Sequence, residues 1–295
     1  MTRVAVVDMG SNSTRLLVAD VAPGGAITEL ERRSVVTRLG QGVEASGALA
    51  DDAMERVFAV LADYRGVIDA CGASVAVGVL TSAVRDAANG AQFAAAVRER
   101  YGIAARTIDG DEEARLTYLG ATSERSGNER VVVIDIGGGS TEMVMGEGAE
   151  LRFHVSTQVG VVRHSERHLH DDPPPPDQVA ALRADAAKTF AAQVPGDLHP
   201  QVGIAVAGTA TQAAAMLGTE QLERAALEAL LDELAALPLA ERQSYPGLDP
   251  ARAATIVAGI AILLEAMTAL GHLDAVEVSD HDILRGAALD HTGFL

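Results

Sequence analysis

The chain has 295 residues, 48% of them hydrophobic, and a formal net charge of −18 at pH 7. This length and composition indicate two folded domains and exclude a largely disordered chain. The strong negative charge argues against a general nucleic-acid-binding or anionic-membrane surface.

Neither the N-terminus nor any apolar run predicts a membrane or secreted protein. "VAVVD" (residues 4–8) follows only three residues and has the pattern of a strand, without the n-region and cleavage site of a leader. The longest apolar run, residues 254–264, is well short of the ~20 residues that a membrane span needs. The single cysteine, Cys71, excludes an intramolecular disulfide and fits a reducing compartment. We expect a cytoplasmic protein with no membrane partner.

The first part of the chain predicts three consecutive strands followed by alternating helices and strands. The predicted strands cover residues 4–7, 15–21, 27–38, 74–80 and 105–109, and the predicted helices residues 51–71, 92–101 and 111–122. The polar, turn-rich residues 123–129 are the best candidate linker.

After the linker the same order begins again: strand, glycine turn, strand, strand. Helices are then predicted over residues 177–194, 221–237 and 250–270. "VGIAVAGT" (202–209) is predicted to be a strand running into a turn, and residues 275–279 a late strand before a terminal helix. The pattern predicts an α/β pseudo-repeat with a cleft between two related domains. The expected domains are residues 1–122, joined by the helix of residues 282–295, and residues 123–281.

Two hairpins carry the repeat. "RVAVVDMGSNSTRLLV" (residues 3–18) and "RVVVIDIGGGSTEMVM" (residues 130–145) share Asp, Gly, Ser and Thr in register. A turn of Gly and small hydroxyl residues lets several backbone N–H groups converge, which suits a phosphate. One such turn alone would be an ordinary hairpin connection, but two copies with an identically placed Asp favour a ligand gripped from two sides.

The aspartates and the residues after Ser-Thr distinguish the two copies. Asp8 and Asp135 end apolar strands, where a carboxylate is costly unless it is hydrogen-bonded or binds a cation, so a bridging Mg²⁺ is the economical interpretation. A turn-capping role is the alternative. The first copy continues with Arg15 and the second with Glu142, which predicts a phosphate side and a metal side.

Four stretches resemble the exopolyphosphatase/guanosine-pentaphosphatase family of the sugar kinase–actin–heat-shock chaperone superfamily. They are "DMGSNSTR" (8–15), "TSAVRDAANG" (81–90), "GDEEARLTYLG" (110–120) and "DIGGGSTE" (135–142). "VAGTATQAAA" (206–215) and "SDHDILRGAAL" (279–289) are similar to later motifs of the family. The motifs span nearly the whole chain in the family's order.

The resemblance implies two actin-like, ribonuclease H-like domains and Mg²⁺-dependent hydrolysis of the terminal phosphate of inorganic polyphosphate. Guanosine pentaphosphate, cleaved at its 5′ phosphate, is the alternative substrate. Glu113 matches the family's catalytic base and would activate water. The neighbouring Glu112 would project about 100° away. From the residues alone, both would belong to an ordinary acidic first turn of a helix.

The implied site draws on both halves of the chain. Arg85 matches a position near the phosphates, although an ion pair with Asp86 or a distant acid explains it equally well. Gly208 and Thr209 lie where superfamily relatives hold a nucleotide, and Thr209 could instead cap the following helix. The expected substrate-binding residues are Ser11, Asn12, Ser13, Arg15, Arg85, Gly137, Gly138, Gly139, Ser140, Thr141, Gly208 and Thr209, and the expected metal ligands Asp135, Glu142 and Asp8.

"VRHSERHLHDD" (162–172) places His164, His168 and His170 close together in the sequence. A metal site is conceivable, but phosphate chemistry with hard metals prefers oxygen ligands, so a solvated basic stretch is favoured. Arg163 and Arg167 would offer its charge to a polyanion.

Longer relatives have an additional helical region that extends the binding channel and helps them dimerise. The chain ends at Leu295, so short polyphosphate chains are the expected substrate. A homodimer is possible, but the sequence does not decide the oligomeric state. A small-molecule kinase of the same superfamily, consuming ATP with an acceptor, and a polyphosphate- or nucleotide-binding sensor without turnover are the other classes consistent with these motifs.

Overall fold

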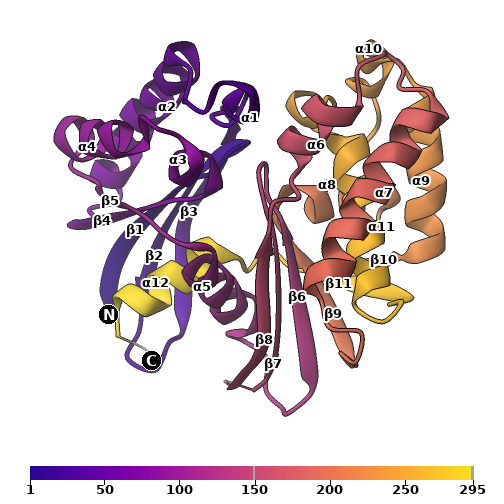
Figure 1. Ribbon diagram of the computed structural model, residues 1–295. Helices are drawn as coiled ribbons and strands as arrows, with labels where there is room; N and C mark the ends of the chain where they lie inside the picture. Colours follow the sequence, from indigo (N-terminus) through magenta and orange to yellow (C-terminus); the bar gives the residue numbers. More distant parts are fainter. Residues whose placement is uncertain (149, 294–295) are drawn as a thin grey trace. The chain divides into compact units, whose positions relative to one another are not determined.

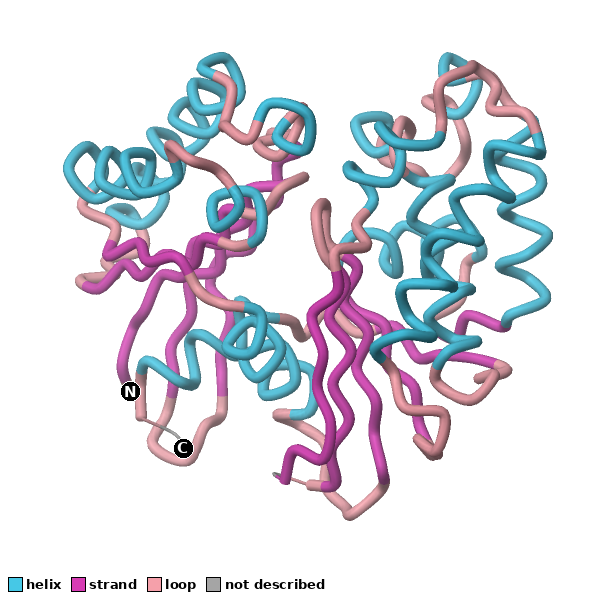
Figure 2. Tube along the Cα trace, in the orientation of Figure 1, coloured by secondary structure: helices cyan, strands magenta, loops and turns pink. Residues whose placement is uncertain are grey.

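The structure is a computed structural model that describes residues 1–148 and 150–293 (Figure 1). The chain divides into two compact units. Unit 1 comprises Met1–Glu124 together with His281–Leu295, and unit 2 comprises Arg125–Asp280. Each unit is an α/β structure built on its own sheet, as Figure 2 shows, and the predicted α/β fold class is confirmed.

Among the described residues, unit 1 has a five-stranded sheet in the order β3-β2-β1-β4-β5. The first three strands form an antiparallel meander, and β4 and β5 add in parallel. The strands are β1 (Thr2–Met9), β2 (Ser13–Val21), β3 (Ile27–Val36), β4 (Val75–Leu80) and β5 (Ala104–Thr107). The helices are α1 (Val43–Ser46), α2 (Asp51–Ala70), α3 (Ser82–Asp86), α4 (Gly90–Tyr101), α5 (Gly110–Thr122) and α12 (Ile283–His291).

The alternation of side chains along β1 and β2 gives this sheet two cores. Val7 and Leu16 belong to the cluster that also contains the apolar faces of α2 and α4. Val6 and Leu17, their immediate neighbours in the two strands, belong to the opposite cluster with α5 and α12. Because successive strand residues point to opposite faces, helices cover both sides of this sheet. The late helix α12 is therefore part of the core of unit 1.

Among the described residues, unit 2 repeats the arrangement in a six-stranded sheet, β10-β11-β9-β6-β7-β8. Its strands are β6 (Arg130–Ile136), β7 (Thr141–Glu147), β8 (Glu150–Thr157), β9 (Val202–Val206), β10 (Gln221–Glu223) and β11 (Ala275–Val278). Its helices are α6 (Val161–His168), α7 (Pro176–Gln193), α8 (Ala207–Leu217), α9 (Arg224–Ala236), α10 (Leu239–Arg242), the 3-10 helix η1 (Pro250–Arg252) and α11 (Ile256–Ala269). Without β10, the strand order is that of unit 1, the order of a ribonuclease H-like domain.

Strand β10 corrects one predicted element. The sequence predicts a helix from Gln221, but Gln221–Glu223 pair antiparallel with β11 and the helix begins at Arg224. Leu222 is fully buried between two exposed neighbours, which is the period of a strand. The long helix predicted from Pro250 is also divided, since η1 ends at Arg252 and α11 begins at Ile256.

The apolar run of residues 254–264 lies largely in α11, which is buried in the main core of unit 2. Among the described residues, the structure has no helix whose length and hydrophobicity would let it cross a membrane.

Candidate functional site

The turn between β1 and β2 in unit 1 is a closed loop of buried small residues. The Gly10 N–H donates to the Ser13 carbonyl at 3.0 Å. The Ser11 hydroxyl lies 2.9 Å from that of Ser82 and accepts from the Ala83 N–H at 3.1 Å, which fixes the turn against the start of α3. Ser11, Asn12 and Ser13 are each no more than 9% exposed.

Asp8 and Arg15 face each other across the same hairpin. They are register partners, and Arg15 Nη2 lies 2.6 Å from Asp8 Oδ2. Arg15 also donates to Asp282, the residue that caps α12. Burial raises the pKa of the Asp8 carboxyl, although the adjacent Arg15 guanidinium lowers it. The carboxylate predicted to bind metal and the arginine predicted to bind phosphate are thus an ion pair in this structure.

The two neighbouring glutamates of α5 have different partners. Glu113 is 8% exposed, and its Oε2 lies 3.2 Å from Arg85 Nη1, which also donates to the Ile108 carbonyl at 3.0 Å. Glu112 binds Arg106, with Nη1 to Oε2 at 2.6 Å. Asp109 caps the helix by accepting from the Glu112 N–H, so α5 begins at Gly110, and Glu113 lies on its buried face.

The turn between β6 and β7 in unit 2 repeats the geometry of the first turn. The Gly137 N–H donates to the Ser140 carbonyl at 2.9 Å, the same bond as that of Gly10 and Ser13. Val161 and Val162, in the first turn of α6, donate through their N–H groups to the carbonyls of Gly137 and Gly138. These hydrogen bonds from the first turn of α6 therefore support the predicted phosphate turn Gly137–Thr141.

Gly160 is where α6 meets this turn. A Cβ atom at Gly160 would lie 2.4 Å from the Gly139 carbonyl carbon and 2.5 Å from the Gly138 carbonyl oxygen. Both contacts are with backbone, which cannot rotate away as a side chain can.

We expect Gly160→Ala to lower the free energy of unfolding by about 1–3 kcal/mol, because the added methyl group overpacks the turn. Thermal or denaturant unfolding of the purified variant measures the change. Gly196→Ala is the matched control, since nothing lies within 4 Å of a Cβ there. Equal stability of the two variants would contradict the close approach of α6 to the turn.

Asp135 and Glu142 occupy in unit 2 the positions of Asp8 and Arg15. They are register partners across the hairpin and are 7% and 1% exposed. The Ser156 hydroxyl of β8 donates to Glu142 Oε1 at 2.6 Å and orients that carboxylate. Like charges directly opposite each other destabilise a sheet, so two buried carboxylates here fit a site for a hard cation with oxygen ligands.

The β9–α8 turn contains the third predicted binding element. Ala207 has φ of 64°, a left-handed conformation that is strained for a residue with a Cβ atom. A Cβ at Gly208 would lie 1.9 Å from Arg252 Nη1, so the guanidinium of Arg252 rests against the backbone of this turn. Thr209 is the third residue of α8 and packs against Gly259 of α11, and the N-cap is Val206. The capping role considered for Thr209 is therefore wrong.

The predicted site residues fall into two groups. In unit 1, Ser11 contacts the start of α3, the short helix that also carries Arg85, the partner of Glu113. In unit 2, Asp135 and Glu142 adjoin the glycine turn. Four residues that support the site were not predicted from the sequence: Ser82, Ser156, Arg252 and Asp282. Ser82 and Asp282 lie within the family-like motifs of residues 81–90 and 279–289, but nothing in those motifs indicated a supporting role for either residue.

The two α/β units share a strand order, and each has a glycine hairpin turn with an Asp before it and a second charged residue after it, which defines a protein of two ribonuclease H-like domains. The Ppx/GppA phosphatase family model matches residues 17–291, which is nearly the whole chain. The chain belongs to this family, and the resemblance found in the sequence is confirmed. It is therefore an enzyme of a phosphatase family.

Relatives and solved structures agree over the full length. The chain is 34% identical to exopolyphosphatase 2 of Mycobacterium tuberculosis over an alignment 319 positions long, which covers 99% of each chain. It is 28% identical to exopolyphosphatase 1 of Mycobacterium bovis, covering 97% of this chain and 87% of that one. The crystal structure of the Ppx/GppA family member of Aquifex aeolicus superposes with a TM-score of 0.81 at 28% identity, covering 99% and 97% of the two chains. That of an exopolyphosphatase-like protein gives 0.91 at 30% identity, covering 98% of each.

Proposed function

We propose that this protein is a Mg²⁺-dependent exopolyphosphatase that hydrolyses the terminal phosphate of inorganic polyphosphate, with a preference for short chains. The observation that carries the proposal is the buried, register-paired Asp135 and Glu142 beside the glycine turn of unit 2. Two relatives that match nearly the whole chain are named exopolyphosphatases, which supports the choice of substrate.

Asp135 and Glu142 would hold the Mg²⁺. Both offer hard oxygen ligands, and Ser156 already orients Glu142. When bound, Mg²⁺ neutralises the charge of the phosphate oxygens and of the two carboxylates. Asp8 fits this role less well, because its Oδ2 is held by Arg15. Its Oδ1 has no hydrogen-bond partner among the residues that the structure describes, so we propose that this oxygen makes its contact through a water molecule.

Glu113 would orient the attacking water and accept its proton. Its carboxylate is buried and held in one place by Arg85, which makes it a positioned base. Arg85 has further N–H donors and can bind a phosphate oxygen while it stays near Glu113. Phosphoryl transfer depends mainly on such positioning and charge neutralisation.

The two hairpin turns would bind phosphate oxygens through converging backbone N–H groups. In unit 1 these are the N–H groups of the turn residues Ser11, Asn12 and Ser13, and Arg15 follows them on β2. In unit 2 they are Gly137, Gly138, Gly139, Ser140 and Thr141. The β9–α8 turn, with Gly208, Thr209 and the adjacent Arg252, would contact phosphates further along the chain. Positive charge near the substrate is thus local, which reconciles a polyanionic ligand with a net charge of −18.

The proposed setting is the cytoplasm, with inorganic polyphosphate as the partner and neither nucleic acid nor membrane. Guanosine pentaphosphate is the alternative substrate of the same chemistry, and a homodimer is compatible with the proposal.

The test is phosphate release by the purified protein with short polyphosphate, long polyphosphate and guanosine pentaphosphate in parallel, with Mg²⁺ or with excess EDTA. We expect the fastest release from short polyphosphate and its loss with EDTA, because the opposed carboxylates then lack their cation. Release only from the nucleotide would overturn the substrate assignment. Binding of polyphosphate without release of phosphate would overturn the hydrolase and indicate a sensor.

A further inference from the structure

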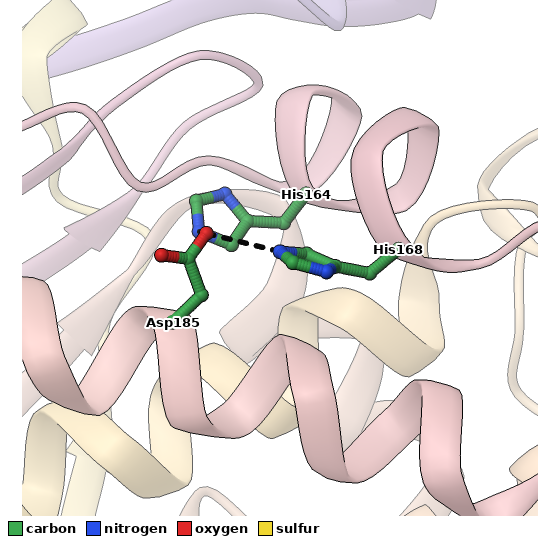
Figure 3. A group of neighbouring side chains, drawn as sticks. All are labelled: His164, His168 and Asp185. Atoms are coloured by element: carbon green, nitrogen blue, oxygen red, sulfur yellow. Dashed lines mark hydrogen bonds and ion pairs between the residues drawn. The ribbon is translucent and has the colours of Figure 1, made fainter.

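A cluster of two histidines and an aspartate lies in unit 2 between helices α6 and α7. His164 and His168 are one turn apart on α6, and Asp185 faces them from α7 (Figure 3). The Asp185 Oδ2 atom lies 3.0 Å from His168 Nε2 and 3.6 Å from His164 Nε2. One nitrogen of each ring and one oxygen of the carboxylate all lie within 4.8 Å of one another.

The three residues of the cluster differ in how deeply they are buried. His164 is fully buried, whereas the side chains of His168 and Asp185 are 17% and 30% exposed. The solvated basic stretch predicted from the sequence is thus wrong for His164. His168 and Asp185 are the members of the cluster that meet solvent, and the rings of His164 and His168, 5.7 Å apart, already face the carboxylate.

We infer that His164, His168 and Asp185 form a binding site for a transition-metal ion of the zinc class. Two imidazoles and one carboxylate are a ligand set that suits Zn²⁺, with a water molecule completing the tetrahedron. Bonds of about 2.0–2.1 Å in a tetrahedron place neighbouring ligand atoms roughly 3.3–3.4 Å apart. The observed 3.0 Å and 3.6 Å lie on either side of that separation, and the two imidazole nitrogens, which lie within 4.8 Å of each other, complete the set.

The site differs in chemistry from the proposed Mg²⁺ site. Imidazole nitrogens favour borderline metals, whereas Asp135 and Glu142 offer only oxygen. The inference therefore does not depend on the proposed hydrolase function, and the two sites can be titrated separately.

Two neighbours of the cluster limit its affinity. Arg167 Nη1 donates to the same Asp185 oxygen at 2.8 Å, and its side chain, 39% exposed, must turn to solvent when a cation binds. The Gly160 N–H donates to His164 Nδ1 at 3.4 Å, so the ring proton must move to Nδ1 and this long bond is lost. We expect a Kd on the order of 1 µM, weaker than in structural zinc fingers.

Metal bound here would act on the glycine turn of unit 2. The first turn of α6 donates its N–H groups to the carbonyls of Gly137 and Gly138, and Arg163 Nε donates to that of Gly139 at 3.0 Å. An ion that joins α6 to α7 would hold this support in place. The role that follows is structural stabilisation of the turn.

The experiment titrates the full-length, untagged, metal-free protein with Zn²⁺ by calorimetry and with Co²⁺ by visible absorption, in excess Mg²⁺. We expect one ion per chain, tetrahedral Co²⁺ absorption and a higher melting temperature with Zn²⁺. His168→Ala and Asp185→Asn should each weaken binding at least tenfold. His170→Ala is the matched control, since His170 is exposed and lies outside the cluster, and it should leave binding unchanged.

Asp185→Asn nearly preserves side-chain volume and so keeps the test valid if His168→Ala unfolds the protein. Absence of stoichiometric binding to the wild-type protein would overturn the inference. Binding that His168→Ala and Asp185→Asn leave intact, or that His170→Ala weakens equally, would also overturn it.

Discussion

Replacing Glu113 with Gln is expected to lower the rate of phosphate release from polyphosphate by about 10²–10⁴-fold, the usual contribution of a positioned general base. The amide cannot accept the proton of the attacking water, but it can still accept the hydrogen bond from Arg85. Substrate binding should therefore change little, so the loss falls on kcat and leaves KM nearly unchanged. Steady-state release of phosphate measures both quantities.

Glu112→Gln is the matched control for this prediction. Glu112 is the adjacent residue of the same helix, but its carboxylate binds Arg106 and takes no part in the Glu113–Arg85 pair. We expect the control to keep near wild-type activity. A comparable loss in both variants would trace the effect to damage of α5, and full activity of Glu113→Gln would remove Glu113 from the reaction.

Replacing Arg15 with Met is expected to destabilise unit 1 by about 3–5 kcal/mol at pH 7, the cost of breaking a buried ion pair on one side. Asp8 is 3% exposed, and its Oδ2 has Arg15 as its cationic partner at 2.6 Å. The chain has no tryptophan, and Tyr64, Tyr101 and Tyr118, three of its four tyrosines, lie in unit 1. Denaturant unfolding followed by tyrosine fluorescence therefore reports mainly on the unit that carries the substitution.

The destabilisation should depend on pH in a definite direction. Burial raises the pKa of Asp8 in the folded protein even with Arg15 present, and removing the cation raises it further. A carboxyl group whose pKa is raised by folding contributes its full stabilisation of the folded state below its unfolded pKa of about 3.9. That contribution is lost as the pH rises through the folded pKa. The deficit of Arg15→Met relative to wild type should therefore shrink as the pH falls from 7 toward that unfolded pKa.

Two further variants separate this cause from general damage. Combining Asp8→Asn with Arg15→Met removes the Asp8 charge together with its partner and should recover part of the lost stability, while Asp282, the other partner of Arg15, keeps Arg32 at 3.8 Å. Arg3→Met breaks an ion pair with Asp20 of similar geometry at the exposed end of the same hairpin, and it should have a much smaller effect. A pH-independent loss, or no recovery in the double variant, would contradict the assignment.

Much of the fold was predictable because its signals are local. Apolar strands of period two and glycine turns defined β1, β2, β6 and β7 to within a few residues. Strand β10 was missed because it has only three residues and its stability comes from pairing with β11, which lies more than 50 residues later. Such non-local pairing leaves little trace in a short window of sequence.

The candidate site was predictable where one residue type carries the chemistry. Asp135 and Glu142 stood out as acids at the ends of apolar strands, and the structure places them opposite each other. Asp282 carried no such meaning in the sequence, because its role follows from the return of α12 to unit 1, where it meets Arg15. Arg252 was invisible for the same reason, since its contact with Gly208 joins segments more than 40 residues apart.

The return of α12 to unit 1 also has a consequence for the order of folding during translation. The ribosome synthesises all of Arg125–Asp280 before the residues of α12, so unit 2 can complete its core first. Until then, Ile283, Leu284 and Leu289 are missing from one face of the unit 1 sheet, and Gly120 lacks the helix that packs against it. The first unit to begin synthesis is thus the last to finish folding, and a nascent chain halted before Asp282 would expose an apolar face for chaperones to bind.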